Sequence, residues 1–372
     1  MKVLNKKLVQ HKFFTFILFT FFIVCCTDTS QKANNKLSIS EKIRLEPNNV
    51  KLLNERIMSN YSKGKLEACL FDLEHCIKID SLNSENYYLA SKIFFEISKE
   101  NHTKNDYPNL ALEYINKSIK ISQNDAKAFA LRGEILLAFG KYKDAIQMFN
   151  KSLELDYNQS NVHLLLGYCF KNLNNIENSI TCFYNSIDVD PQNVESYIQL
   201  GQVYHKKLDT LAIKYYNSAL RLDSKNINTL YNKALFYQHI KDYNKAIEGY
   251  NQLFKHDPFN MNGHYNLGFI HMELEVYDVA ANNFSDAIYS YSNFHEAYYS
   301  RGICFENLGN IAQAEVDYKR ALEIKPDYTY AKEAYDQLLT KNNKLNYEYS
   351  GKNKWWNKAF DEGEECRQAF SS

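Results

Sequence analysis

Apolar and polar positions along the chain follow a pattern that returns every 34 residues. Within each period, two stretches place apolar residues at the spacing of one helix face, and a short polar turn separates them. Residues 126–159 give a clear copy, and the pattern is seen again in 160–193, 227–260, 261–294 and 295–328. A period of this length predicts an all-α solenoid in which each unit is a pair of antiparallel helices.

Several positions of the repeat, numbered as slots 1 to 34, each prefer one type of residue. Slot 8 in the first helix is small, as in Gly133, Gly167, Gly201, Ala234, Gly268 and Gly302. Slot 24 in the second helix is aromatic, as in Phe149, Phe183, Tyr216, Tyr250, Phe284 and Tyr318. Slots 20 and 27 are again small, as in Ala145, Ala212, Ala246, Ser152, Ser186 and Ala219. A glycine inside a helix costs about 1 kcal/mol of helix propensity, so we infer that slot 8 lets the two helices approach closely.

These slots recur together and in register, and in this they resemble the tetratricopeptide repeat family. The resemblance implies a superhelical solenoid of about eight helix–turn–helix units, closed by a C-terminal capping helix at 329–341. The units are 50–83, 84–125, 126–159, 160–193, 194–226, 227–260, 261–294 and 295–328. Three of them depart from the pattern. The first unit has Arg56-Ile57 where Leu-Gly is usual, and the second carries an insertion around Lys99–Asn109. Unit 194–226 lacks one residue in the turn between its helices.

The N-terminus has the three parts of an export signal. A lysine-rich start precedes the apolar run Phe13–Val24, which is too short for a comfortable membrane span, and Cys25-Cys26 follows. The end of this run resembles a bacterial lipobox, which implies a lipoprotein signal peptide at 1–25 and lipidation of Cys26. An ordinary signal peptide or an anchor helix is the alternative.

A polar tether at 26–37 and a helical lead-in at 38–49 follow the signal. The abundance of Asn, Lys, Ile and Tyr, together with the lipobox and the repeats, resembles lipoproteins of the Bacteroidota. This resemblance implies a location in the cell envelope, with the lipid anchored in the outer membrane.

Composition and motifs bound the chemistry that this chain can perform. Lys plus Arg equals Asp plus Glu at 44 each, so the net charge is zero, and we expect no nucleic-acid partner. The cysteines of the repeats occupy small apolar slots and are expected to be free thiols. The chain contains no phosphate-binding loop, no Cys-x-x-Cys and no His-Glu-x-x-His. We therefore predict no catalytic residue, no metal site, no cofactor and no enzymatic activity.

The resemblance also implies a concave groove lined by slots 2, 5, 9 and 12 of the first helices. Its predicted binding residues are Tyr88, Phe95, Tyr168, Tyr231, Tyr265, Phe269 and Tyr299. Aromatic side chains with polar tips are typical of interface hot spots, so the groove is expected to hold a peptide segment or a helix of another protein. The alternative is that these side chains pack between neighbouring first helices. No unit has Lys and Asn together at slots 5 and 9, which disfavours a clamp for a chaperone tail.

The C-terminal residues 342–372 read as a polar linker and an amphipathic, tryptophan-rich tail. Its apolar residues Trp355, Trp356, Phe360 and Phe370 are expected to contact either the last units or a partner. The sequence as a whole predicts a protein-interaction scaffold. We expect it to be a membrane-anchored lipoprotein that uses its aromatic groove to organise an envelope complex for secretion, gliding or outer-membrane assembly. Two alternatives are a peptide- or glycan-binding module that serves a partner enzyme, and a non-lipidated soluble adaptor.

Overall fold

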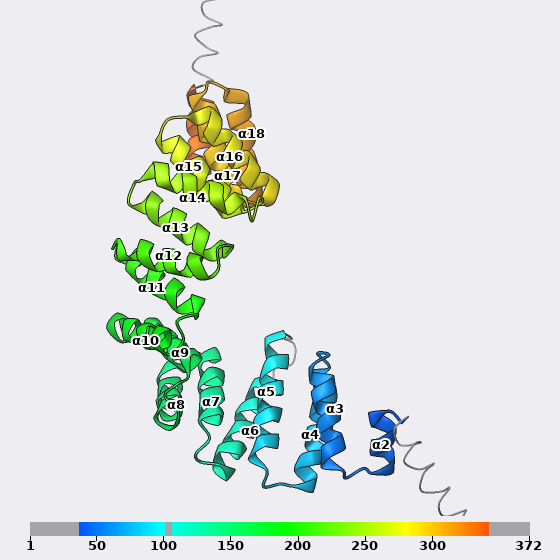
Figure 1. Ribbon diagram of the computed structural model, residues 1–372. Helices are drawn as coiled ribbons and strands as arrows, with labels where there is room; N and C mark the ends of the chain where they lie inside the picture. The colour runs from blue at the N-terminus through cyan, green and yellow to red at the C-terminus, as the bar shows by residue number, and fades with distance from the viewer. Residues whose placement is uncertain (1–36, 101–105, 342–372) are drawn as a thin grey trace, which may run out of the picture. The chain divides into compact units, whose positions relative to one another are not determined.

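The computed structural model describes residues 37–100 and 106–341, and within these ranges it is built of helices joined by short turns, with no strand (Figure 1). The predicted all-α solenoid of helix–turn–helix units is confirmed. The signal peptide, the lipidation site Cys26 and the tail residues Trp355, Trp356, Phe360 and Phe370 lie outside the described residues.

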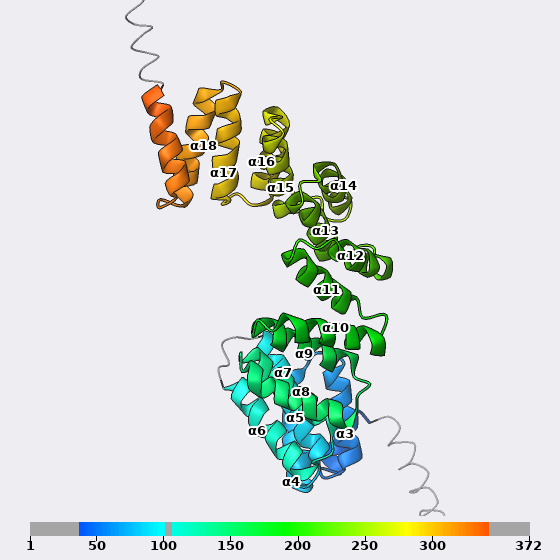
Figure 2. The same ribbon diagram turned by 90° about the vertical axis from the view of Figure 1, so that its left-hand side faces the viewer.

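Each unit contributes a first and a second helix, which lie side by side in both views (Figure 1 and Figure 2). The first helices are α3 (Val50–Tyr61), α5 (Ser84–Glu100), α7 (Ala126–Ala138), α9 (Ser160–Asn172), α11 (Val194–Lys206), α13 (Ile227–His239), α15 (Met261–Glu273) and α17 (His295–Asn307). The second helices are α4 (Leu66–Ile79), α6 (Tyr107–Ile121), α8 (Tyr142–Leu155), α10 (Ile176–Val189), α12 (Leu211–Leu222), α14 (Tyr243–Phe254), α16 (Tyr277–Ser290) and α18 (Ile311–Ile324). Helix α2 (Ile39–Leu45) precedes the first unit, and residues 329–341 are helical after the last.

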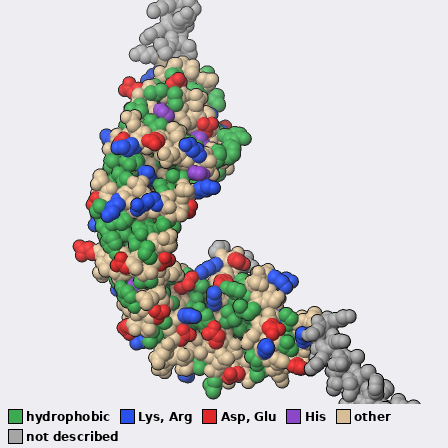
Figure 3. All heavy atoms as spheres, in the orientation of Figure 1, with side chains coloured by type: hydrophobic (Ala, Val, Ile, Leu, Met, Phe, Trp, Pro, Cys, Tyr) green, Lys and Arg blue, Asp and Glu red, His purple; other side chains and the backbone are tan. Residues whose placement is uncertain are grey.

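The helices fall into two compact blocks, one ending at Val189 and one beginning at Asp190. In the N-terminal block, α5, α7 and α9 follow one another as a row of contacting first helices. In the C-terminal block, α11, α13, α15 and α17 form a row of the same kind. Acidic and basic side chains are scattered over the visible face of each block (Figure 3).

The small residue of slot 8 lies directly beneath the aromatic ring of slot 24. A Cβ atom added to Gly133 would lie 2.6 Å from Cε1 of Phe149, and one added to Gly302 would lie 2.6 Å from Cε1 of Tyr318. Both rings are fully buried. Glycine is therefore required here by the ring of the partner helix, which is the close approach that the sequence predicts.

Unit 227–260 reaches the same packing by moving the glycine to the other helix. It has Ala234 in slot 8, and Gly249 stands opposite it in slot 23 of α14. A Cβ atom on Gly249 would lie 2.9 Å from Cβ of Ala234. The missing side chain at Gly249 therefore makes room for the methyl group of Ala234.

Hydroxyl groups at slot 24 are matched by polar side chains at slot 12 of the same unit. Tyr250 donates a hydrogen bond to Oε1 of Gln238 at 2.7 Å, and Tyr318 donates to Oε2 of Glu306 at 3.0 Å. Burial raises the pKa of Tyr250, which keeps this hydroxyl protonated as a donor. Where slot 24 is phenylalanine, slot 12 holds Leu137, Lys171 or Met272. A buried hydroxyl needs a partner, and slot 12 supplies it where slot 24 is Tyr250 or Tyr318.

The first and last complete units share a buried ion pair between slots 7 and 23. Arg301 donates from Nε and Nη2 to the two carboxylate oxygens of Asp317, at 2.8 and 2.7 Å, and from Nη1 to Ser285 at 3.0 Å. Arg56 makes the same set of bonds to Asp72 and to Ser40 of α2. Ser285 belongs to the second helix of the preceding unit. Helix α2 therefore occupies the place that the second helix of a preceding unit would take. The described residues contain no first helix to pair with it.

The repeat cysteines are free and buried, as predicted: Cys69, Cys76, Cys169, Cys182 and Cys304. Burial raises the pKa of the Cys169 thiol to about 12 and that of the Cys182 thiol to about 11. These thiols are therefore protonated and unreactive near neutral pH. The insertion expected around Lys99–Asn109 falls partly in helix, because α5 continues to Glu100 and α6 begins at Tyr107.

Candidate functional site

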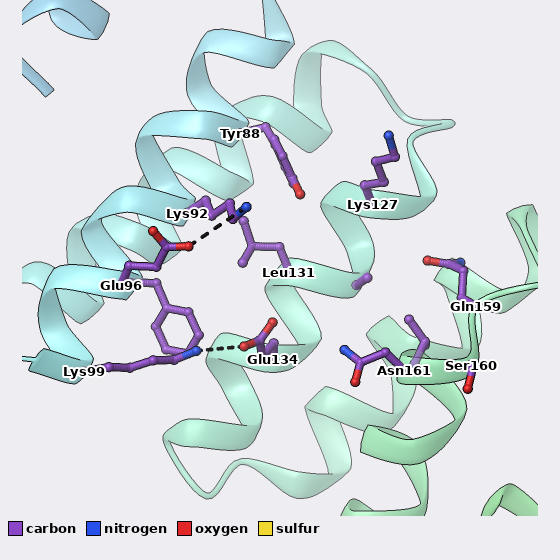
Figure 4. Close-up of a pocket in the computed structure, with 13 residues that line it drawn as sticks. Tyr88, Lys92, Glu96, Lys99, Lys127, Leu131, Glu134, Gln159, Ser160 and Asn161 are labelled. Carbon is purple, nitrogen blue, oxygen red and sulfur yellow. Dashed lines mark hydrogen bonds and ion pairs between the residues drawn. The ribbon is translucent and has the colours of Figure 1, made fainter. Parts of the chain in front are cut away.

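A pocket of about 400 Å³ opens on the row of first helices in the N-terminal block (Figure 4). One wall comes from α5, the floor from α7, and the far edge from the start of α9. Its lining residues are Tyr88, Lys92, Phe95, Glu96, Lys99, Lys127, Ala130, Leu131, Glu134, Gln159, Ser160, Asn161 and Val162. Because three successive units contribute, the pocket exists only when the units are stacked.

The apolar part of the pocket is made by Tyr88, Phe95 and Leu131. Phe95 and Leu131 are buried, while Tyr88 is half-buried and its side chain points from α5 toward α7 (Figure 4). Burial raises the pKa of Tyr88, so its hydroxyl is a neutral donor and acceptor at physiological pH. Two of the seven predicted groove residues, Tyr88 and Phe95, thus line the pocket together.

The charged groups of the pocket are unevenly paired. Nζ of Lys99 forms a salt bridge with Oε1 of Glu134 in the next unit at 2.8 Å. The same ammonium group lies 4.0 Å from the ring centroid of Phe95. Lys92 lies 3.9 Å from Glu96 on the same helix. Lys127 is exposed at the rim, and no carboxylate of the described residues lies within ion-pair distance of it. Within ranges 37–100 and 106–341, Lys127 is thus an exposed cation without an ion-pair partner beside an apolar wall.

The groove residues predicted in the C-terminal block are mostly packed against their own units. The ring centroids of Tyr231, Tyr265 and Tyr299 lie 6.2, 5.5 and 6.0 Å from the rings of slot 24 in the same units. The Tyr231 hydroxyl also accepts a hydrogen bond from Asn266 at 2.9 Å. Phe269, on α15, is 38% exposed. In the N-terminal block, Tyr168 meets the ring of Phe183 edge to face at 6.0 Å.

Sequence reasoning missed Lys127 and Asn161, which line the pocket from slot 2 of their units. Each is an ordinary polar residue near a helix start, and neither is unusual within its own helix. The signal that could have found them is the slot itself, because slot 2 belongs to the groove-lining set of the repeat.

Two features are absent from the part of the chain that the structure describes. No group of three or more His, Cys, Asp or Glu side chains is arranged to hold a metal ion in ranges 37–100 and 106–341. Within the same residues, no helix combines the length and the apolar character that crossing a bilayer requires.

Comparison with known families identifies the repeats. Models of the tetratricopeptide repeat match residues 126–159, 160–193, 227–260 and 295–328. For these four units, the tetratricopeptide repeats that the slot pattern predicts are confirmed. No curated protein matches the chain.

Solved structures that resemble this chain have low sequence identity to it. The C-terminal part of a TPR repeat-containing protein from Cytophaga hutchinsonii is 17% identical, with a TM-score of 0.54, covering 62% of this chain and 95% of that one. MamA from Desulfovibrio magneticus is 18% identical, with a TM-score of 0.43 and coverage of 48% and 96%. YrrB, described as a TPR protein with an unusual peptide-binding site, is 16% identical, with a TM-score of 0.42 and coverage of 51% and 95%. The first of these supports the fold and nothing further.

Proposed function

We propose that this chain is a protein-interaction scaffold whose N-terminal block holds a segment of a partner protein on the first helices α5, α7 and α9. The observation that carries the proposal is the pocket shared by three successive units, with Tyr88 and Phe95 in its wall. Concave sites that combine apolar contact area with a few polar groups are typical binding sites. The confirmed repeats agree with a binding role, because such arrays present extended surfaces to partners.

The pocket chemistry indicates which kind of segment fits. An apolar side chain of the ligand would lie against Tyr88, Phe95 and Leu131, where it leaves water. Lys127 and Asn161 stand on the opposite side of the opening (Figure 4), where they can donate hydrogen bonds to backbone carbonyls or to a side-chain oxygen. An extended peptide of a protein partner satisfies both requirements.

Replacement of Tyr88 with alanine should weaken peptide binding about tenfold, since removing one hot-spot side chain typically costs about 1–2 kcal/mol. Peptides selected by the wild-type protein from an array would be titrated by fluorescence anisotropy against Tyr88→Ala and Lys127→Ala. The matched control is Lys151→Ala, because Lys151 is exposed on the second helix α8. Equal affinities for wild type, Tyr88→Ala and Lys127→Ala would show that the peptides bind elsewhere.

We further propose that the scaffold is a lipoprotein held in the envelope by Cys26, where it organises a complex for secretion, gliding or outer-membrane assembly. The support is the order of basic start, apolar run and Cys25-Cys26 in the sequence. A lipid anchor attaches the protein to the membrane without a basic surface, in agreement with the net charge of zero.

The Cys26→Ser variant should leave the membrane fraction and keep its signal sequence, because lipid attachment needs the thiol. Fractionation combined with mass spectrometry of the N-terminal peptide measures both effects, and Cys25→Ser serves as the neighbouring control. A Cys26→Ser protein that stays in the membrane fraction with the wild-type N-terminus would contradict the lipid anchor and leave the peptide-binding result untouched.

A further inference from the structure

Two histidines of the C-terminal block, one repeat apart in sequence, meet at the ends of neighbouring first helices. His205 lies in the last turn of α11 and His239 is the last residue of α13. Nε2 of His205 lies 2.9 Å from Nδ1 of His239, and Nδ1 of His205 lies 3.2 Å from the hydroxyl of Tyr216. The peptide site proposed above uses neither of them.

We propose that His205 and His239 form a two-histidine site for a divalent transition-metal ion such as Zn²⁺, with water in the remaining positions. Imidazole nitrogen is a preferred ligand of Zn²⁺, with bonds of about 2.0–2.1 Å. In a tetrahedral site with such bonds, two ligand nitrogens lie about 3.3 Å apart. The observed 2.9 Å separation therefore has to widen by a few tenths of an ångström, which a small rotation of the exposed His239 ring provides.

One hydrogen bond holds the ring of His205 in place. Its Nδ1 lies 3.2 Å from the hydroxyl oxygen of the fully buried Tyr216. This contact leaves Nε2 as the ring nitrogen that faces His239. A second hydrogen bond of this kind commonly orients a metal-binding histidine.

The site is fixed on one side and open on the other. The ring of His205 packs edge-on against Phe236 at a centroid distance of 5.1 Å, so its orientation is set by the core. His239 is exposed, which leaves room for the water ligands of an ion with two protein ligands. A bound ion would connect α11 to α13, and thus join unit 194–226 to unit 227–260.

The test is calorimetric titration of the full-length protein with ZnCl₂ at pH 7.5, together with thermal unfolding with and without the ion. We expect one saturable site of micromolar affinity that depends on His239, and a rise of a few degrees in Tm. His239→Gln should weaken that site at least tenfold and abolish the Tm rise, while His256→Gln, a histidine between α14 and α15, should keep both. Because His239 is exposed, unfolding of the metal-free variant should match that of wild type.

Two results would overturn the proposal. One is the lack of any saturable Zn²⁺ binding by the wild-type protein. The other is equal binding by wild type and His239→Gln, which would place the ion on other donors of the chain. A His205→Gln variant that still binds Zn²⁺ with wild-type affinity would likewise remove His205 from the site.

Discussion

Phe149→Ala should destabilise the protein by about 3–5 kcal/mol, and Gly133→Ala by about 1–3 kcal/mol, yet the two changes together should cost less than their sum. Phe149 is fully buried, so its truncation leaves a cavity between α7 and α8. A Cβ atom on Gly133 would lie 2.6 and 2.7 Å from two atoms of that ring, and the packed ring has little room to move. In the double variant the ring is gone, and alanine regains its helix propensity of about 1 kcal/mol.

The measurement is urea unfolding of the wild type, the two single variants and the double variant, followed by circular dichroism. The double-mutant cycle gives the coupling between the two positions directly, and we expect about 2–3 kcal/mol. Asn150→Ala, at an exposed position next to Phe149 on the same helix, should change the free energy of unfolding by less than about 0.5 kcal/mol. A stabilising effect of Gly133→Ala alone would contradict the close contact between slots 8 and 24.

Arg301→Ala should destabilise the protein by about 3–5 kcal/mol, because it leaves the carboxylate of Asp317 buried without a partner. Asp317 is 2% exposed, and both of its oxygens accept hydrogen bonds from Arg301. Replacing both residues with alanine should recover much of the loss, since the uncompensated charge is then removed with its partner.

The chain offers a matched control for this prediction in the same slot of another unit. Arg132 stands in slot 7 of unit 126–159, but slot 23 of that unit is Met148. Arg132→Ala removes a guanidinium group without leaving a buried carboxylate, so we expect a cost of about 1 kcal/mol or less. Unfolding by urea under identical conditions compares the two variants. Similar costs for Arg301→Ala and Arg132→Ala would show that the carboxylate of Asp317 is not the cause.

The helix pairs could be predicted because each unit repeats the same types of residue in the same slots. Gly133 and Phe149 stand in slots 8 and 24, and their contact is set by two helices that are close in sequence. The pairing of Tyr250 with Gln238 follows the same logic, since a buried hydroxyl in slot 24 requires an acceptor in slot 12. A regular repeat therefore predicts contacts within a unit well.

The sites between units were harder to predict, because they depend on which residues neighbouring helices bring together. Tyr88 and Phe95 were expected to line a groove because of their slots. The placement of the exposed Lys127 opposite them, and the salt bridge from Lys99 to Glu134, arise only where α5 meets α7. His205 and His239 belong to different units, and each is unremarkable in its own helix. A search for polar pairs spaced by one repeat length would have found them.

The ion pairs of the first and last complete units bear on how the array loses its structure. A repeat protein behaves as a linear chain of coupled elements, in which an inner element has two neighbours and a terminal one has fewer. Terminal elements are therefore the natural starting points of fraying. Arg56 with Asp72, and Arg301 with Asp317, tie together the two helices of the first and last complete units, which within the described residues are flanked on their outer sides by single helices only. These ion pairs add stability inside the two outermost units, so unfolding need not begin there.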